Sequence, residues 1–387
     1  MFMIKLKKVI VADENMPAVE SLFSSFGEVR RVAGRSLETS QLVDADTLLV
    51  RSITQVNAQL LDDAKRIEFI GSATIGMDHM DARYLNERSI PFSNAAGCNA
   101  DSVVDYALAA IYEFAEKRAL DPLSLSYGVV GAGNVGSRLV NRLAALGVRV
   151  LVSDPPRAKR DSDFVDTPLV QLMAQSDVVC CHLPLTKVGE HATHHLLGAS
   201  LLNQLAPGSL LLNAGRGPTI NGQELLKFAQ QRTDVTLVMD VWENEPDVDI
   251  ELAERVLIGT PHIAGYSLEG KLRGTYMLYE RYCELLGLPV SVTFDSLFTD
   301  YQTPSMDLTR QTTVQQVIRS VYSINEDHQR FKASLNPIKS QAQAFDQLRK
   351  RYPVRREFAS LKLSGKTTEA IKFQLSALGF KVDEVQV

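Results

Sequence analysis

The sequence predicts an α/β protein with two doubly wound parallel-sheet domains and a small C-terminal α/β unit. Three observations support this prediction. Short apolar runs alternate with helical patterns from residue 6 to 95, a second alternation follows from about residue 127 to 265, and the sequence becomes loop-rich after residue 290. The chain has 387 residues, 45% of them hydrophobic, so it can bury the cores of two or three domains.

The first alternation begins with an apolar strand and continues with a helical pattern after Pro17. Because strands separated by helices pair in parallel and are covered on both faces, this part predicts a parallel sheet. A long apolar helix, which Asp101 can cap, then connects the two halves. The predicted strands and the connecting helix are "KVIVAD", "TLLVRS", "EFIGSATIG", "IPFSNAAG" and "NADSVVDYALAAIYEFAEKR".

The second alternation predicts another doubly wound sheet, with strands at "YGVVGAG", "VRVLVSD", "DVVCCHLPL", "SLLLNAG", "TLVMDVW" and "VLIGTPHIAG". After residue 290, "SVTFDSLFTDYQTPSMD" is loop-rich, and a helix is expected across "TVQQVIRSVYSINEDHQRFKASL". The last segments, "FASLKL", "TTEAIKFQLSALG" and "FKVDEV", suggest strand, helix and strand. Residues 291–387 are therefore expected to form a third small α/β unit.

Composition excludes several classes of protein. The chain has no run of eighteen apolar residues, so we expect no membrane span, and its net charge of −5 gives no overall basic surface for nucleic acid. The early run "VIVA" is too brief for a signal peptide, which suggests a cytoplasmic protein. Four cysteines are expected to be buried thiols rather than disulfides: Cys98, Cys180, Cys181 and Cys283.

A glycine-rich turn, "GAGNVG", follows the first strand of the second half and opens an amphipathic helix. Gly131 would permit the tight turn, Gly133 would let a pyrophosphate approach the backbone, and Gly136 would let helix and strand pack closely. Asn134 and Val135 begin the helix, whose free N–H groups favour phosphate. The context predicts a dinucleotide site, although the triplet alone could be an ordinary strand-to-helix turn.

An acidic residue, Asp154, ends the next strand, eighteen residues after Gly136. A carboxylate at this position hydrogen-bonds an adenosine ribose hydroxyl and repels a 2′-phosphate, which favours NAD over NADP. The nearby cations Arg157, Lys159 and Arg160 could hold that phosphate instead. We favour the carboxylate, because the sheet fixes its position and the cations lie in a loop.

Three later strand ends carry residues suited to redox chemistry on a 2-hydroxy acid: Arg216, Glu245 and His262. Ligands of open α/β sheets bind beyond the carboxyl ends of the strands. His262 would be the base for the hydroxyl proton, Glu245 would orient and charge it, and Arg216 would pair with the substrate carboxylate. Each residue alone could be a loop arginine, a surface glutamate or a core histidine, but the combination predicts a catalytic set.

His191, His194 and His195 in "GEHATHHLLG" could suggest a metal site. His191 and His195 stand one helical turn apart, yet few acidic residues accompany them. The "CCH" sequence at 180–182 lies in a predicted strand, whose successive side chains point to opposite faces. We therefore expect no metal.

The motifs "GAGNVG", "NAGRGP", "DVWENEP" and "TPHIAGYS" resemble the D-isomer-specific 2-hydroxyacid dehydrogenase family over roughly residues 8 to 285. The resemblance implies an NAD-dependent enzyme whose catalytic residues are Arg216, Glu245 and His262. It also implies a substrate domain made from residues 1–98 and 265–290 around an NAD-binding Rossmann domain, residues 99–264.

Further stretches, including "ADENMP", "GSATIGMDHMD" and "AAGCNADSVVDY", resemble family members that oxidise 4-phospho-D-erythronate at C2 in pyridoxal phosphate biosynthesis. This resemblance implies hydride transfer from C2 to nicotinamide and a homodimer formed through residues 291–387. Leu183 stands where many relatives have a hydroxyl residue, so a polar contact there must come from backbone. The resemblance implies substrate contacts by Ser52, Thr74 and Tyr266 and NAD contacts by Asp154, Ala214, Gly215, Arg216, Asp240 and Gly265.

The substrate phosphate needs a further cation, for which Arg51 is the first candidate and Lys271 and Arg273 are weaker ones. Arg51 could equally pair with a carboxylate at a domain interface. Two alternative functions remain open: another 2-hydroxyacid dehydrogenase, acting on phosphoglycerate, glycerate or lactate, or a dinucleotide-sensing binding protein of the same fold.

Overall fold

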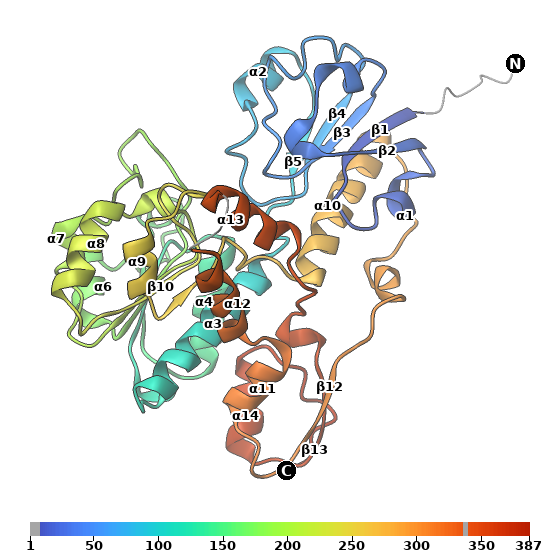
Figure 1. Cartoon of the computed structure of the whole chain (residues 1–387). Helices are drawn as coiled ribbons and strands as arrows, with labels where there is room; N and C mark the ends of the chain where they lie inside the picture. Colours follow the sequence, from blue (N-terminus) through green and yellow to red (C-terminus); the bar gives the residue numbers. More distant parts are fainter. Residues whose placement is uncertain (1–7, 336–339) are drawn as a thin grey trace, which may run out of the picture. The chain divides into compact units, whose positions relative to one another are not determined.

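The computed structural model describes residues 8–335 and 340–387 and divides into two compact units (Figure 1). Unit 1 contains the residues up to Asn99 together with Ser267–Gln302, and unit 2 contains Ala100–Tyr266 and Thr303–Val387. The small C-terminal α/β part expected from the sequence is present, and it packs with Ala100–Tyr266 in unit 2.

Unit 1 is built on a five-stranded parallel sheet with the order β2-β1-β3-β4-β5. Its strands are β1 Lys8–Asp13, β2 Gly27–Val32, β3 Thr47–Val50, β4 Phe69–Ser72 and β5 Phe92–Asn94. Its helices are α1 Val19–Phe23, α2 Ala82–Glu87 and α10 Leu268–Leu286, with 3-10 turns at Gly34–Ser36, Thr39–Leu42 and Phe294–Phe298.

Helix α10 packs against β4 and α1. Ser267 caps its start by accepting a hydrogen bond from the N–H of Gly270 (2.8 Å), and Gly287, at φ 64°, ends it. A Cβ on Gly274 would lie 3.0 Å from the carbonyl oxygen of Ala73, so a small residue lets the helix approach the chain beyond β4. Tyr279 of α10 completes an aromatic cluster with Phe23.

Unit 2 is built on a six-stranded parallel sheet with the order β11-β10-β9-β8-β6-β7. The strand order reverses between β6 and β8, which is where ligands bind in such sheets. Its strands are β6 Tyr127–Val130, β7 Val150–Ser153, β8 Val178–Cys181, β9 Leu210–Asn213, β10 Thr236–Met239 and β11 Ile258–Gly259. Its helices are α3 Ala100–Lys117, α4 Asn134–Ala145, α5 Pro155–Ala158, α6 Leu169–Gln175, α7 Ala199–Leu202, α8 Gly222–Gln231 and α9 Ile250–Arg255, with 3-10 turns at Pro122–Ser124 and Gly217–Thr219.

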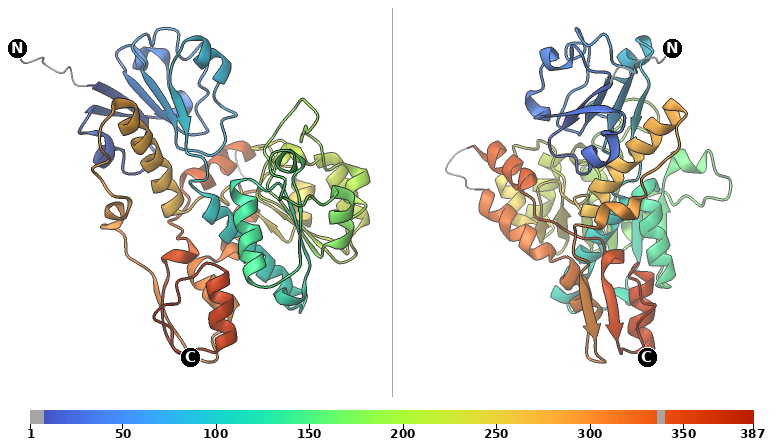
Figure 2. Two further views of the ribbon diagram at one scale, coloured as in Figure 1. Left: turned by 180° about the vertical axis from the view of Figure 1, so that it is seen from behind. Right: turned by 90° about the vertical axis from the view of Figure 1, so that its right-hand side faces the viewer.

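The C-terminal part of unit 2 adds a two-stranded parallel sheet and four helices, and Figure 2 shows its two strands side by side. Charged side chains join it to α3 and α4: Arg319 pairs with the buried Glu113 of α3 (2.7 Å), and Arg142 of α4 donates to the carbonyl of Leu378 (2.9 Å). Its elements are β12 Ser305–Leu308, β13 Lys362–Gly365, α11 Val314–Val321, α12 Ile324–Ser334, α13 Gln341–Lys350 and α14 Glu369–Ala377, with a 3-10 turn at Phe358–Ser360.

The structure differs from the sequence expectation at several elements. The single helix expected over residues 313–335 is two helices, because the chain leaves helical geometry at Tyr322. The expected last strand, "FKVDEV", makes only isolated bridges, such as Lys362 with Lys381. Strands β2 and β12 and helix α13 were not anticipated.

Within the described residues, every helix is too short or too polar to cross a membrane. The four cysteines are free and buried. Burial raises the pKa of the Cys181 thiol to about 12, and burial also raises the pKa of the Cys180 thiol beside it, so both remain protonated.

Candidate active site

The glycine-rich turn lies between β6 and α4. Gly131 has a φ of 89°, which suits glycine, and its N–H donates to the carbonyl of Ser153 (2.9 Å). A Cβ on Gly136 would lie 1.9 Å from the carbonyl oxygen of Gly131, so a side chain there would force the helix away from the strand. Gly133 faces open space, and the first N–H groups of α4 at Asn134 and Val135 have no intrahelical partner. The turn therefore fits the pyrophosphate of a dinucleotide.

Asp154 is held against this turn. One carboxylate oxygen accepts the N–H of Ala132 (2.7 Å), and the other accepts the N–H of Arg157 (2.9 Å). By the second bond Asp154 caps the start of the short helix α5. The Arg157 guanidinium donates to the hydroxyl of Ser137 (2.9 Å), and Lys159 pairs with Glu190 (2.7 Å). The carboxylate is thus fixed by the fold beside the glycine turn, while these two nearby cations have partners of their own.

Arg216 follows β9, and the loop around it is held by backbone contacts. A Cβ on Gly217 would lie 2.0 Å from the carbonyl oxygen of Trp242, and one on Gly215 would lie 2.9 Å from the backbone of Leu183. The two glycines are therefore required by neighbouring protein backbone. The side chain of Arg216 donates to the carbonyl of Gly215 (2.9 Å), and the N–H of Ala214 donates to the backbone carbonyl of Cys181 (3.3 Å).

His262 and Glu245 form a direct pair: Nδ1 of His262 lies 2.5 Å from Oε1 of Glu245. The other Glu245 oxygen accepts the N–H of Trp242 (3.1 Å), the residue whose carbonyl packs against Gly217. Burial raises the pKa of Glu245, but His262, the Trp242 N–H and Arg349 outweigh burial and hold that pKa below its usual value. The carboxylate is therefore ionised and can stabilise a protonated imidazole.

Asp240 organises the turn that carries His262. Its buried carboxylate accepts hydrogen bonds from the Thr260 hydroxyl (2.7 Å), the N–H of Ile263 (2.8 Å) and the N–H of Ala264 (3.0 Å). Gly265 follows in the same turn. Sequence reasoning treated Asp240 only as an NAD contact and missed this supporting role.

The other predicted substrate contacts, apart from Tyr266, belong to unit 1. Thr74 follows β4, where its hydroxyl lies 2.7 Å from that of Ser72 and donates to the carbonyl of Gly76 (3.0 Å). Ser52 is exposed just beyond β3, and Arg51 precedes it. Among the weaker candidates, Arg273 of α10 donates to the carbonyl of Cys98 (2.5 Å).

Tyr266 ends the turn after His262, and two residues of the C-terminal part flank its ring. The guanidinium of Arg349 lies 5.7 Å from the ring centroid, and the Tyr352 ring meets it edge-on at 5.8 Å. Sequence reasoning missed both residues, since they belong to no motif and lie more than 80 positions from Tyr266.

The histidines considered for a metal show a different arrangement. His195 contacts Glu243 through Nε2 and stacks on His194 at 3.9 Å. Across the described residues, no group of three or more His, Cys, Asp or Glu side chains is placed to hold a metal ion. His182 follows β8, and both of its ring nitrogens are buried without a hydrogen-bond partner among the described residues.

Comparison with known proteins places this chain in a class. Residues 115–264 match the NAD binding domain of D-isomer specific 2-hydroxyacid dehydrogenases, and residues 298–379 match a domain of unknown function, DUF3410. The fold resembles NAD+-bound 3-phosphoglycerate dehydrogenase from Entamoeba histolytica, with a TM-score of 0.60, 20% identity and coverage of 72% of this chain and 96% of that chain. It also resembles D-lactate dehydrogenase from Aquifex aeolicus, with a TM-score of 0.58, 22% identity and coverage of 72% and 96%. The protein is an NAD-dependent dehydrogenase of the D-isomer-specific 2-hydroxyacid class.

Relatives similar over nearly the whole chain define the particular family. Erythronate-4-phosphate dehydrogenase of Pseudomonas fluorescens (strain SBW25) is 45% identical, covering 96% of this chain and 99% of its own. The enzyme of the same name from Azotobacter vinelandii is 46% identical, covering 92% and 94%, and that from Proteus mirabilis is 44% identical, covering 96% and 98%. The chain belongs to the erythronate-4-phosphate dehydrogenase family.

Proposed function

We propose that the protein oxidises 4-phospho-D-erythronate at C2 to (R)-3-hydroxy-2-oxo-4-phosphooxybutanoate, a step in pyridoxal 5′-phosphate biosynthesis. The observation that carries the mechanism is the bond between His262 Nδ1 and Glu245 (2.5 Å), because it leaves Nε2 as the nitrogen that can take a proton from a substrate. When bound, NAD supplies the acceptor for the hydride that leaves C2.

In this mechanism His262 accepts the proton of the C2 hydroxyl while Glu245 stabilises the imidazolium that forms. Arg216 binds the C1 carboxylate through its guanidinium, and the backbone contacts of Gly215 and Gly217 fix the loop from which it extends. Ser52 and Thr74 of unit 1 and Tyr266 of unit 2 are proposed to contact the substrate.

For the cofactor, we propose that the turn at Gly131, Gly133 and Gly136 binds the pyrophosphate and that Asp154 binds the adenosine ribose. The carboxylate of Asp154 accepts the Ala132 N–H, which holds it beside the glycine turn. The proposed contacts to the nicotinamide half come from Ala214, Gly215, Asp240 and Gly265.

The direct test is a substrate panel with purified protein and NAD. Formation of NADH, read by absorbance, should be fastest with 4-phosphoerythronate and much slower with 3-phosphoglycerate, glycerate and D-lactate. A parallel assay with a tetrazolium dye would detect turnover even if the reduced cofactor stays bound. Preference for one of the other acids would replace the proposed substrate, and no turnover by either readout would support a dinucleotide-sensing role instead.

We further propose a homodimer formed through the C-terminal part and a cytoplasmic location. Large hydrophobic side chains of this part are exposed, including Phe373 at 56% and Val354 at 70%, and such side chains are available to pack against a second subunit. The four buried, free cysteines are compatible with a reducing compartment.

A further inference from the structure

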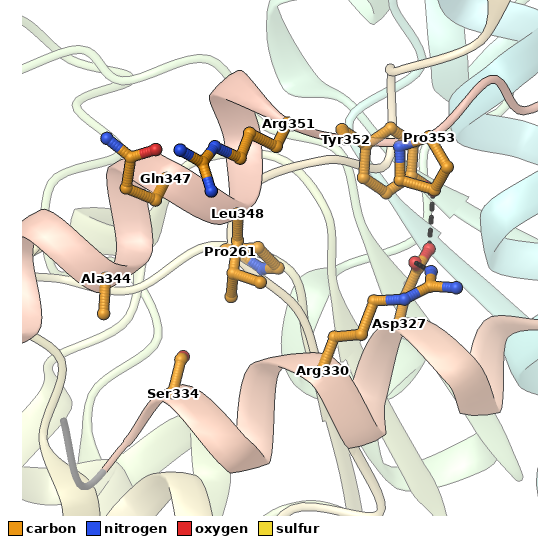
Figure 3. Close-up of a pocket in the computed structure, with 10 residues that line it drawn as sticks. All are labelled: Pro261, Asp327, Arg330, Ser334, Ala344, Gln347, Leu348, Arg351, Tyr352 and Pro353. Atoms are coloured by element: carbon orange, nitrogen blue, oxygen red, sulfur yellow. Dashed lines mark hydrogen bonds and ion pairs between the residues drawn. The ribbon is translucent and has the colours of Figure 1, made fainter.

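The matched domain of unknown function contributes helix α13 to unit 2, and the two faces of this helix differ. Ala344, Gln347, Leu348 and Arg351 line a pocket of about 530 Å³, together with Pro261 and residues of α12 (Figure 3). At 100° per residue, Arg349 falls on the opposite face, one turn after the buried Phe345. Arg349 is therefore directed to the interior of unit 2.

On this inner face Arg349 meets the catalytic turn. Its guanidinium lies 5.7 Å from the centroid of the Tyr266 ring, within the range of a cation–π contact. Its Nε is buried and has no hydrogen-bond partner among the described residues. Burial lowers the pKa of Arg349, but Tyr266 and Glu245 outweigh burial and raise that pKa, so the group stays charged.

A buried guanidinium N–H without an acceptor costs on the order of 1–3 kcal/mol, or more because the group is charged. Glu245 does not remove this cost by a hydrogen bond, because Nε of Arg349 has no acceptor among the described residues, Glu245 included. An anion that binds beside Tyr266 would supply the missing acceptor. The proposed substrate carries two anionic ends, of which Arg216 is assigned the carboxylate.

We propose that Arg349 is a substrate-binding residue that the C-terminal domain contributes to the active site, with its Nε–H donating to the phosphate of the substrate. This inference rests on the proposed function, which requires a phosphorylated acid. It gives the C-terminal domain a part in substrate selection. It also adds a phosphate-binding cation to Arg51, the candidate drawn from sequence.

The test compares Arg349→Met, which keeps much of the aliphatic stem but removes the charge, with Arg351→Met, which removes an exposed cation lining the outer pocket. For Arg349→Met we expect KM for 4-phosphoerythronate to rise about 10- to 100-fold, the size of a lost charged hydrogen bond. KM for unphosphorylated erythronate should change less than about threefold, and Arg351→Met should leave both values unchanged.

An equal loss on both substrates, or a shifted pH profile of kcat, would overturn the proposal, because it would show that Arg349 acts by positioning Tyr266 or Glu245. Circular dichroism and NAD affinity verify folding. If Arg349→Met does not fold, Arg349→Lys carries the test, with a smaller rise in KM confined to the phosphorylated substrate.

Binding of inorganic phosphate separates this proposal from the proposed function. Titration calorimetry with the NAD-loaded wild type and Arg349→Lys should show weaker phosphate binding in the variant, whichever acid the enzyme oxidises. Equal phosphate affinity would refute the role of Arg349 even if 4-phosphoerythronate is the substrate. Failure of the wild type to oxidise 4-phosphoerythronate would refute the proposed function alone.

Discussion

The proposed proton acceptor is His262, and the fold constrains it from two directions. Its backbone has a φ of 56°, unusual for a residue with a side chain, and its ring is bonded to Glu245. Asp240 holds the residues on either side of it. These contacts fix the orientation of the imidazole ring, and a proton acceptor needs a fixed orientation toward its substrate.

Replacing His262 with alanine should lower kcat by about 10²- to 10⁴-fold, because the C2 hydroxyl would lose its base. Binding of NAD, measured by fluorescence titration, should stay within a few-fold of wild type, since the glycine turn is separate from this side chain. Near-normal turnover of the variant would show that another group takes the proton.

A second histidine, His182, should make the free energy of unfolding depend on pH. Burial lowers its pKa from an ordinary 6.5 to about 4, so the unfolded chain takes up a proton that the folded chain does not. Its contribution to stability is complete above pH 6.5 and is lost as pH falls toward 4, by up to about 3 kcal/mol. Urea unfolding of wild type and His182→Gln between pH 4 and 7 should show a flatter pH dependence in the variant. Parallel curves would mean that the ring protonates freely in the fold.

At the scale of elements, sequence reasoning identified the strands whose apolar runs are continuous, such as β9, and missed those that are partly exposed. Strand β2 includes Arg30 and Arg31 and is half-buried along its length, so its sequence has no apolar run. The candidate site followed the same principle. Arg216, Glu245 and His262 could be proposed from sequence because parallel strands end at one edge, whereas Arg349 reaches Tyr266 only through the packing of a distant helix.

The stability of the turn that follows β11 should fall more when Asp240 is replaced than when one of its hydrogen-bond donors is removed. Asp240→Asn replaces one acceptor oxygen with an NH2 group that opposes a backbone N–H, so we expect a loss of about 1–3 kcal/mol in the free energy of unfolding and a lower kcat. Thr260→Val removes only one of the three donors and should cost less on both measures. Guanidinium unfolding and steady-state kinetics measure the two effects. Equal stability of Asp240→Asn and wild type would show that the carboxylate does not support the turn.

At the scale of the whole molecule, the C-terminal part serves the site as well as the proposed dimer. Arg355 is buried and donates to the carbonyls of Ser102 (3.2 Å) and Ile263 (3.4 Å). It therefore joins the segment after α13 to the turn that carries His262. Its guanidinium also lies 4.4 Å from the centroid of the Tyr322 ring. A chain truncated before residue 303 would lose these contacts around His262.

The proposed dimer can be tested at Phe373, an exposed side chain of α14. Phe373→Glu places a charge in the proposed apolar contact, so light scattering coupled to size exclusion should show a monomer where the wild type is a dimer. Val188→Glu, at a side chain that is 81% exposed in another part of unit 2, is the matched control and should leave the mass unchanged. Because Arg349 and Phe373 lie on different helices, the monomer should still bind inorganic phosphate as the wild type does. A Phe373→Glu protein that stays dimeric would place the interface elsewhere on the chain.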